Sequence, residues 1–260
     1  MQLIDTHAHL DHLENLTEAL ERAQGAGVVG IVTVGVDLAA NKKNLEIKKS
    51  SRQPRIYAAL GIHPGNINAA EIDETLKFIR ENIREAVAIG ETGLDYWYKE
   101  VRKDEAKKEE QRTIFRKQLE LAHEFDLPVV IHSRGAWRDC LNMSTEMGIK
   151  KALFHWYSGP VDILKEILAN GYYVSSSPSL AYSPQSREAI AYAPIERTLI
   201  ETDSPVYYGE KDLGFQAEPK DVFRTLTAYA ALKKISEDKA VTILNQNAKD
   251  FFALRDLSLH

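Results

Sequence analysis

Residues 3–11 of the chain, LIDTHAHLD, join an apolar start to two histidines that are one residue apart. Leu3–His7 has the length and apolar character of a buried strand, whereas histidine fills a core poorly. Side chains alternate along a strand, so residues two apart share a face at a spacing of roughly 6–7 Å. His7 and His9 can therefore reach one cation and are predicted metal ligands, and Asp5 has the same parity and should point into the interior beneath them.

Short apolar segments of this kind recur along the chain, and longer segments with helical periodicity separate them. The predicted strands are Leu3–His7, Val28–Val36, Ile56–His63, Ala86–Thr92, Pro128–Ser133, Ala152–Tyr157, Tyr172–Ser177 and Leu199–Asp203. The predicted helices lie near 15–26, 38–49, 71–84, 104–126, 136–148, 160–170, 184–192 and 219–233. The strands lack polar alternation, as in parallel sheets that are covered on both faces. This alternation predicts an α/β fold, a closed (β/α)8 TIM barrel.

The rest of the sequence predicts one globular domain over residues 1–260. No linker rich in Gly, Ser or Pro divides the chain, and the tail from Ser236 to Leu254 should add extra C-terminal helices. Hydrophobic residues make up 44% and charged residues 27%, which is ordinary globular usage. The formal charge of −5 does not attract polyanions, so nucleic acid would need a local positive site.

Cysteine usage and the lack of long apolar runs indicate where the protein works. Cys140 is the single cysteine, which excludes a disulfide within the chain and fits a reducing compartment. The sequence shows neither a signal-peptide pattern nor an apolar run that approaches 18 residues. We therefore expect a cytoplasmic protein without membrane contact, either a monomer or a weak oligomer.

Polar side chains gather at the carboxyl ends of several predicted strands. Beyond the opening motif, these ends carry His63 in GIHP, Glu91 in GETGLD, His132 in VVIHSR, His155 in LFHWY and Asp203 in IETDSP. In a barrel the carboxyl ends of the strands converge on one mouth. Imidazole and carboxylate are the usual ligands of zinc and also accept manganese, iron or magnesium. The pattern therefore predicts a metal site at that mouth.

The number of candidate ligands predicts two divalent ions, roughly 3.5–4 Å apart, rather than one. Glu91 is the predicted bridge, His7, His9 and Asp203 would complete one site, and His132 and His155 the other. Water bound there would lose a proton near neutral pH, with Asp203 as general base. Taken alone, a strand histidine is more often a hydrogen-bonded core residue, and a lone carboxylate a salt-bridge partner or loop cap.

Further residues around this mouth receive supporting roles from their parity. Glu201, like Asp5, should orient ligand histidines or pair with a buried cation. Arg134 would bind a phosphate oxygen in a two-pronged bond, or else form a salt bridge across the rim. His63 would bind substrate or stabilise transition-state charge. The aromatic residues at the mouth would stack on bases or pack within loops: Tyr96, Trp97, Tyr98, Trp156 and Tyr157.

These motifs resemble the TatD family of metal-dependent hydrolases, within the amidohydrolase-like barrels. The resemblance covers nearly the whole chain, through IDTHAHLD, ALGIHP, AIGETGLDYWY, QLELAHEFDLPVVIHSR, LFHWYSG, IETDSP and NQNAKDFFAL. It implies a TIM barrel with two divalent ions and phosphodiester hydrolysis, typically as a 3′-to-5′ exonuclease or DNase. The leading hypothesis is therefore a phosphodiesterase that acts on DNA ends with two divalent ions, of Mg, Mn or Zn. The family's metal ligands correspond to His7, His9, Glu91, His132, His155 and Asp203, and Asp203 and Glu91 are the predicted catalytic residues.

Three departures from the family pattern concern the substrate side of the pocket. HSRGA has Gly135 where many members have an acid, and HWY replaces HCF. The loop VYYGEKDLGFQAEP lacks the family's arginine and asparagine. Alternative functions are therefore an amide, ester or lactone hydrolase, including removal of a misattached amino acid from tRNA, and a non-enzymatic metal-binding adaptor.

Overall fold

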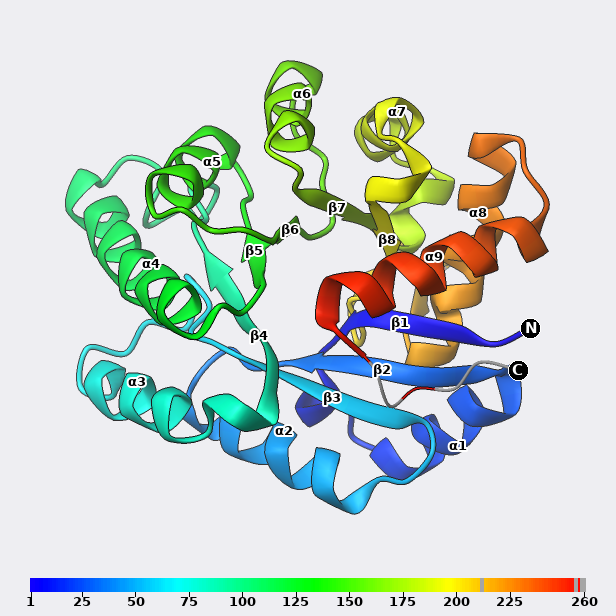
Figure 1. The fold of residues 1–260 in the computed structure, drawn as a ribbon, viewed down its shortest axis with the longest axis horizontal. Coiled ribbons are helices and arrows are strands. Elements are labelled where there is room, and N and C mark those ends of the chain that lie inside the picture. Colours follow the sequence, from blue (N-terminus) through cyan, green and yellow to red (C-terminus); the bar gives the residue numbers. More distant parts are fainter. Residues whose placement is uncertain (211–212, 255–256, 258–260) are drawn as a thin grey trace.

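The barrel strands form one continuous sheet. The structure, a computed structural model, describes residues 1–210, 213–254 and 257 (Figure 1). Eight strands lie in the order β1 to β8, and each pairs with the next in parallel. They are β1 Leu3–Ala8, β2 Val28–Val34, β3 Arg55–Leu60, β4 Ala86–Gly93, β5 Val129–His132, β6 Ala152–Phe154, β7 Tyr173–Ser176 and β8 Thr198–Ile200.

The sheet closes where the segment after β8 meets the end of β1. An isolated parallel bridge joins Ala8 to Ser204. The His9 N–H donates to the Ser204 carbonyl at 2.8 Å, and the Asp203 N–H donates to the His7 carbonyl at 2.9 Å. The predicted TIM barrel is thereby confirmed, and its closing seam lies among predicted site residues.

Several strands end earlier than the sequence predicts, which corrects the expected bounds of β3, β6 and β8. His63, His155 and Asp203 each lie just beyond a strand rather than inside it. Trp156 and Asp203 have φ angles of 42° and 50°. Such left-handed backbone cannot continue an extended strand. The chain is therefore outside the sheet at these two residues, which follow the ends of β6 and β8.

Helices surround the strands on the outside of the barrel (Figure 1). They are α1 Leu16–Ala26, α2 Leu38–Ser50, α3 Ile72–Glu81, α4 Glu105–Phe125, α5 Trp137–Glu146, α6 Val161–Ala169, α7 Pro184–Tyr192 and α8 Val222–Lys233. Side-chain caps explain some of the starts: the Asp104 carboxylate accepts the N–H groups of Ala106 and Lys107 at the start of α4. Within the described residues, none of the helices has the length and apolar character needed to cross a membrane.

A further helix, α9 Glu237–Phe252, covers the amino ends of β1 and β8. Phe251 and Phe252 pack with interior residues of the barrel such as Ile4 and Val32. The predicted extra helical structure at the C-terminus is therefore confirmed. Because α9 covers this end of the barrel, the strands' carboxyl ends are left for a functional site. The assignment of residues 1–260 to a single domain stays a prediction.

Asn245 of α9 generates a stability prediction. Its side-chain oxygen accepts the buried Ile4 N–H at 3.1 Å, and its Nδ2 donates to the Gln2 carbonyl at 2.8 Å. Asn245→Ala leaves the Ile4 N–H without this acceptor, so the free energy of unfolding should fall by about 1–3 kcal/mol in urea denaturation. The exposed neighbour Gln246 is the control, and Gln246→Ala should change the free energy of unfolding by less than about 0.5 kcal/mol. Equal losses in the two variants would contradict this role of Asn245.

Candidate metal centre

The carboxyl end of the barrel brings the predicted ligands together. His7 lies in β1, Glu91 in β4 and His132 in β5. The remaining residues immediately follow a strand or lie a few residues beyond one: His9, His63, His155 and Asp203. Elements that are far apart in sequence thus supply one compact cluster of imidazoles and carboxylates.

A first group of donor atoms surrounds one oxygen of Glu91. Glu91 Oε2 lies 3.4 Å from His7 Nε2 and 3.5 Å from His9 Nε2. Asp203 Oδ1 lies 3.4 Å and 3.2 Å from the same two nitrogens. Ligands placed tetrahedrally around one ion, at bonds of about 2.1 Å, are separated by roughly 3.4 Å. These donor atoms therefore have the mutual spacing that a single ion requires.

A second group surrounds the other oxygen of the same carboxylate. Glu91 Oε1 lies 2.8 Å from His155 Nε2, 3.0 Å from His132 Nδ1 and 3.5 Å from His63 Nε2. His155 Nε2 and His132 Nδ1 are 3.4 Å apart. Glu91 therefore contributes one oxygen to each group, which is the geometry of a bridging ligand.

Unsatisfied nitrogens in this cluster fit a bound cation. Within the described part of the chain, His7 Nδ1, His7 Nε2 and His9 Nδ1 have no hydrogen-bond partner, and His7 is 0% exposed. A buried polar atom without a partner is costly. A divalent ion would satisfy Nε2 of His7, and the donor set of imidazole and carboxylate suits such an ion.

Both carboxylates are held in the ionised form. Burial opposes ionisation of Glu91, yet the imidazoles around it, first that of His155, keep its pKa well below the usual range. Burial also opposes ionisation of Asp203, but its hydrogen bond with His9 and the charge of His7 lower its pKa to about 2. An ionised carboxylate is the form that binds a cation.

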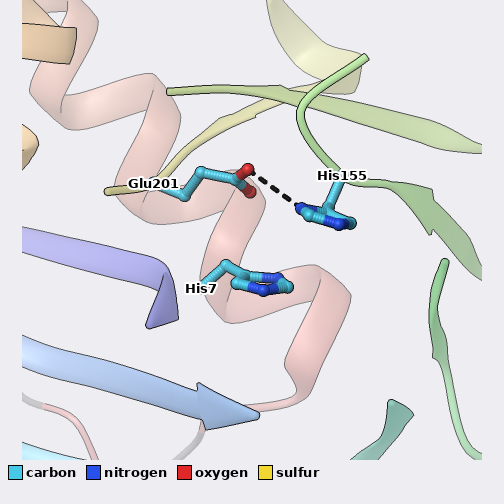
Figure 2. Close-up of side chains that lie close together, drawn as sticks. All are labelled: His7, His155 and Glu201. Atoms are coloured by element: carbon cyan, nitrogen blue, oxygen red, sulfur yellow. Dashed lines mark hydrogen bonds and ion pairs between the residues drawn. The ribbon is translucent and has the colours of Figure 1, made fainter. Parts of the chain in front are cut away.

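Glu201 lies behind the cluster and contacts a predicted ligand. Figure 2 shows its side chain extending toward His155, with Oε1 3.2 Å from His155 Nδ1. Ser175 Oγ donates to the other carboxylate oxygen. The His155 ring stacks on that of His7, with centroids 4.1 Å apart and planes inclined by 13°. A carboxylate at Nδ1 keeps a proton there, so Nε2 is the nitrogen that would bind a cation.

Asp5 supports the centre through the backbone rather than through an imidazole. Its Oδ1 accepts the Thr202 N–H at 2.9 Å and the His7 N–H at 3.4 Å. Its Oδ2 accepts from Thr202 Oγ1 at 2.6 Å. Asp5 therefore ties β1 to the segment that carries Asp203, and it positions His7 without touching its ring.

Asp95 is a site residue that the sequence analysis missed. It is fully buried, and its Oδ2 lies 2.7 Å from His132 Nε2. The same oxygen accepts from Nε of Arg134 at 2.8 Å and pairs with Nη2 at 2.8 Å. Asp95 fixes the orientation of His132 so that Nδ1 faces Glu91. The available signal was its place in GETGLD, four residues after Glu91, but strand parity assigns no direction to a residue beyond the strand end.

The contacts of Arg134 correspond to the salt-bridge alternative raised by the sequence. Its guanidinium is anchored on Asp95 and lies over the Tyr98 ring, with Cζ 5.1 Å from the ring centroid. The side chain is still 49% exposed at the rim. The cation is therefore fixed in place while part of it faces solvent.

His63 is a hydrogen-bond donor at the edge of the cluster. Burial lowers the pKa of His63 to about 3, so its imidazole is neutral at neutral pH. The Gly65 N–H donates to His63 Nδ1 at 3.0 Å, which leaves the ring hydrogen on Nε2. Nε2 is the atom that faces Glu91. A neutral imidazole in this tautomer donates from Nε2 and has no lone pair there for a metal.

Most aromatic residues at the mouth pack within loops. Tyr157 is buried and donates to the Pro160 carbonyl at 2.8 Å. The Trp156 indole donates to Ser179 Oγ at 2.8 Å, and Tyr96 donates to an Asp139 oxygen at 2.8 Å. These three rings are therefore held by the fold, whereas the adjacent Trp97 is exposed.

The chain is similar to known proteins over nearly its whole length. The family described as TatD related DNase matches residues 4–253. The uncharacterized metal-dependent hydrolase YabD of Bacillus subtilis is 32% identical over 97% of this chain and 99% of its own length. The human deoxyribonuclease TATDN3 is 30% identical over 96% of this chain and 94% of its own. The crystal structure of YJJV, a TatD homologue from Escherichia coli, superposes with a TM-score of 0.87 and 25% identity. The match covers 97% of this chain and 98% of the YJJV chain. The resemblance seen in the motifs is confirmed, and the chain belongs to the TatD family of metal-dependent hydrolases.

Proposed function

We propose that the protein is a divalent-metal-dependent phosphodiesterase that acts on DNA ends as a 3′-to-5′ exonuclease. The observation that carries this proposal is the shared carboxylate of Glu91, with one oxygen in each of two donor groups. Paired donor groups of this kind suit the two-metal hydrolysis of phosphate esters. The name deoxyribonuclease of the human relative supports DNA as the substrate.

Two ions, of Mg, Mn or Zn, would be held by this chain's predicted ligands. His7, His9 and Asp203 would hold one, His132 and His155 the other, and Glu91 would bridge them. When bound, a pair of divalent ions neutralises charge on the phosphate and lowers the pKa of the attacking water.

The remaining steps belong to the protein's own side chains. Asp203, which is ionised, would accept the proton of the attacking water. His63 would donate from Nε2 to a phosphate oxygen, and this bond strengthens as charge develops in the transition state. Arg134, fixed by Asp95, would bind a further phosphate oxygen. The formal charge of −5 favours a short stretch at a strand end over a long duplex footprint.

The single cysteine bears on the compartment in which the protein would work. Cys140 is a free, buried thiol, and burial raises its pKa well above the usual range. An unpaired thiol fits a reducing cytoplasm. We propose a cytoplasmic protein that is a monomer or weak oligomer.

Release of nucleotides from single-stranded DNA tests the activity. Protein loaded with Mg²⁺ or Mn²⁺ should release mononucleotides from 3′ ends, EDTA should abolish the release, and added metal should restore it. Asp203→Asn should lower kcat by roughly 100-fold or more, because it removes the proton acceptor. Asp250→Asn is the isosteric control, since Asp250 is exposed on α9 at the other end of the barrel.

Two results would contradict the assignment. Metal-loaded protein that releases no nucleotide from any DNA end would overturn the phosphodiesterase proposal. Hydrolysis of acyl or amide substrates by the same preparation would then identify the alternative hydrolase. Asp203→Asn protein with unchanged kcat would remove Asp203 from the proposed chemistry.

Asp95 generates a separate prediction about metal affinity. Asp95→Asn removes the charge that holds His132, so the affinity for Mn²⁺ or Zn²⁺ should fall by roughly 10- to 100-fold in competition with a chromophoric chelator. Asp139→Asn is the control, because Asp139 binds Tyr96 and Arg112 rather than an imidazole. Equal metal affinities for Asp95→Asn and wild-type protein would contradict the positioning role.

A further inference from the structure

Trp97 presents an exposed aromatic ring beside the candidate centre. It is 67% exposed, whereas its neighbours Tyr96 and Tyr98 are partly buried. Its backbone is fixed, because the Trp97 N–H donates to Asp95 Oδ1 at 2.8 Å. The other oxygen of that carboxylate contacts His132. The turn that supports a predicted metal ligand therefore also carries an indole at the surface.

Gly135 provides the space in which this indole lies. Its φ is +72°, and a Cβ added there would lie 2.2 Å from Trp97 Cδ1 and 2.8 Å from Trp97 Nε1. The edge of the indole therefore lies directly against the backbone of Gly135, three residues after His132. A side chain at this position would displace the ring, so the arrangement depends on glycine.

Arg134 supplies a fixed cation that shares its anchor, Asp95, with Trp97. It immediately precedes Gly135 in the chain, and Asp95 anchors both its guanidinium and the backbone of Trp97. Arg134 contacts Asp95 through Nε and Nη2, and the Arg134 side chain is half exposed. One carboxylate thus fixes both a cation and the turn that carries a flat apolar ring. This combination matches a nucleotide, because a phosphate can pair with the guanidinium and a base can stack on the ring.

We propose that Trp97 is a stacking platform for the nucleobase that adjoins the phosphate held at the centre. The inference rests on the proposed function and adds a subsite to it, for a base of the terminal nucleotides. Stacking on an aromatic ring is tolerant of sequence because every base has a π-face. The platform therefore recognises the presence of a base and discriminates little among the four bases.

Terminal abasic substrates isolate this contact. Two short single-stranded oligonucleotides are compared, which differ only in whether the 3′-terminal residue carries a base or is a tetrahydrofuran abasic analogue. Wild-type protein should prefer the base-bearing substrate in kcat/KM. Trp97→Ala should raise KM for that substrate by roughly 5- to 100-fold and bring the ratio between the two substrates close to one. Trp97→Phe should retain part of the preference.

Tyr192 offers a matched control. It is another exposed aromatic residue, at 49%, and it ends α7 shortly before β8 begins, on the opposite side of the barrel from the mouth. Tyr192→Ala should leave the ratio between the two substrates as in wild-type protein. Circular dichroism of each variant establishes that the fold is retained.

Fluorescence gives a reading that does not depend on turnover. Oligonucleotides with a slowly cleaved terminal phosphorothioate are titrated against the metal-loaded protein, and the indole emission is followed. The chain also contains Trp137 and Trp156, so the same titration of Trp97→Phe supplies the emission to be subtracted. The base-bearing oligonucleotide should quench the Trp97 emission, and the abasic one should quench it far less.

The outcomes separate this inference from the proposed function. If wild-type protein cleaves DNA and Trp97→Ala keeps the full preference for the base-bearing end, the subsite is overturned while the phosphodiesterase proposal stands. If wild-type protein cleaves no DNA, the proposed function fails and the quenching titration decides: quenching by the base-bearing oligonucleotide alone supports the platform, and equal or absent quenching overturns it.

Discussion

The buried carboxylate of Glu91 is the contact on which the site depends. It is 2% exposed at the end of β4, and its two oxygens face imidazoles that come from different sides of the barrel. An ionised carboxylate with so little solvent must have positive partners. Two further carboxylates orient the imidazoles around Glu91. Asp95 contacts His132 and Glu201 contacts His155, and each of these histidines presents its other ring nitrogen to Glu91 Oε1.

The barrel meets this requirement by combining distant segments at one end. Parallel strands all finish at the same side, and the hydrogen bonds of Asp5 to Thr202 fix the two edges of the sheet relative to each other. Helix α9 covers the opposite end, where Phe251 and Phe252 pack against interior residues of the barrel. The cluster of buried imidazoles is unfavourable by itself, since His7 has two nitrogens without partners in the described chain. A cation that bound only the folded protein would offset this cost and would couple metal binding to stability.

Period and parity predicted the barrel and the gathering of His7, His9, Glu91, His132, His155 and Asp203, because strand ends in a barrel must converge. They could not predict contacts made after the chain leaves the sheet. The left-handed residues Trp156 and Asp203 lie just beyond the ends of β6 and β8, and no periodic pattern marks such positions. Asp95 was missed for the same reason. It lies in the turn after β4 and contacts His132 and Arg134 at the end of the neighbouring strand β5. Trp97 lies against Gly135, which is remote from it in sequence, and no periodic pattern predicts that contact.

The measurement that tests the shared carboxylate most directly is anomalous diffraction from a crystal grown with Mn²⁺. Two anomalous peaks are expected roughly 3.5–4 Å apart, with one oxygen of Glu91 bound to each ion. A single peak, or two ions of which neither is bound by Glu91, would contradict the bridging role of Glu91.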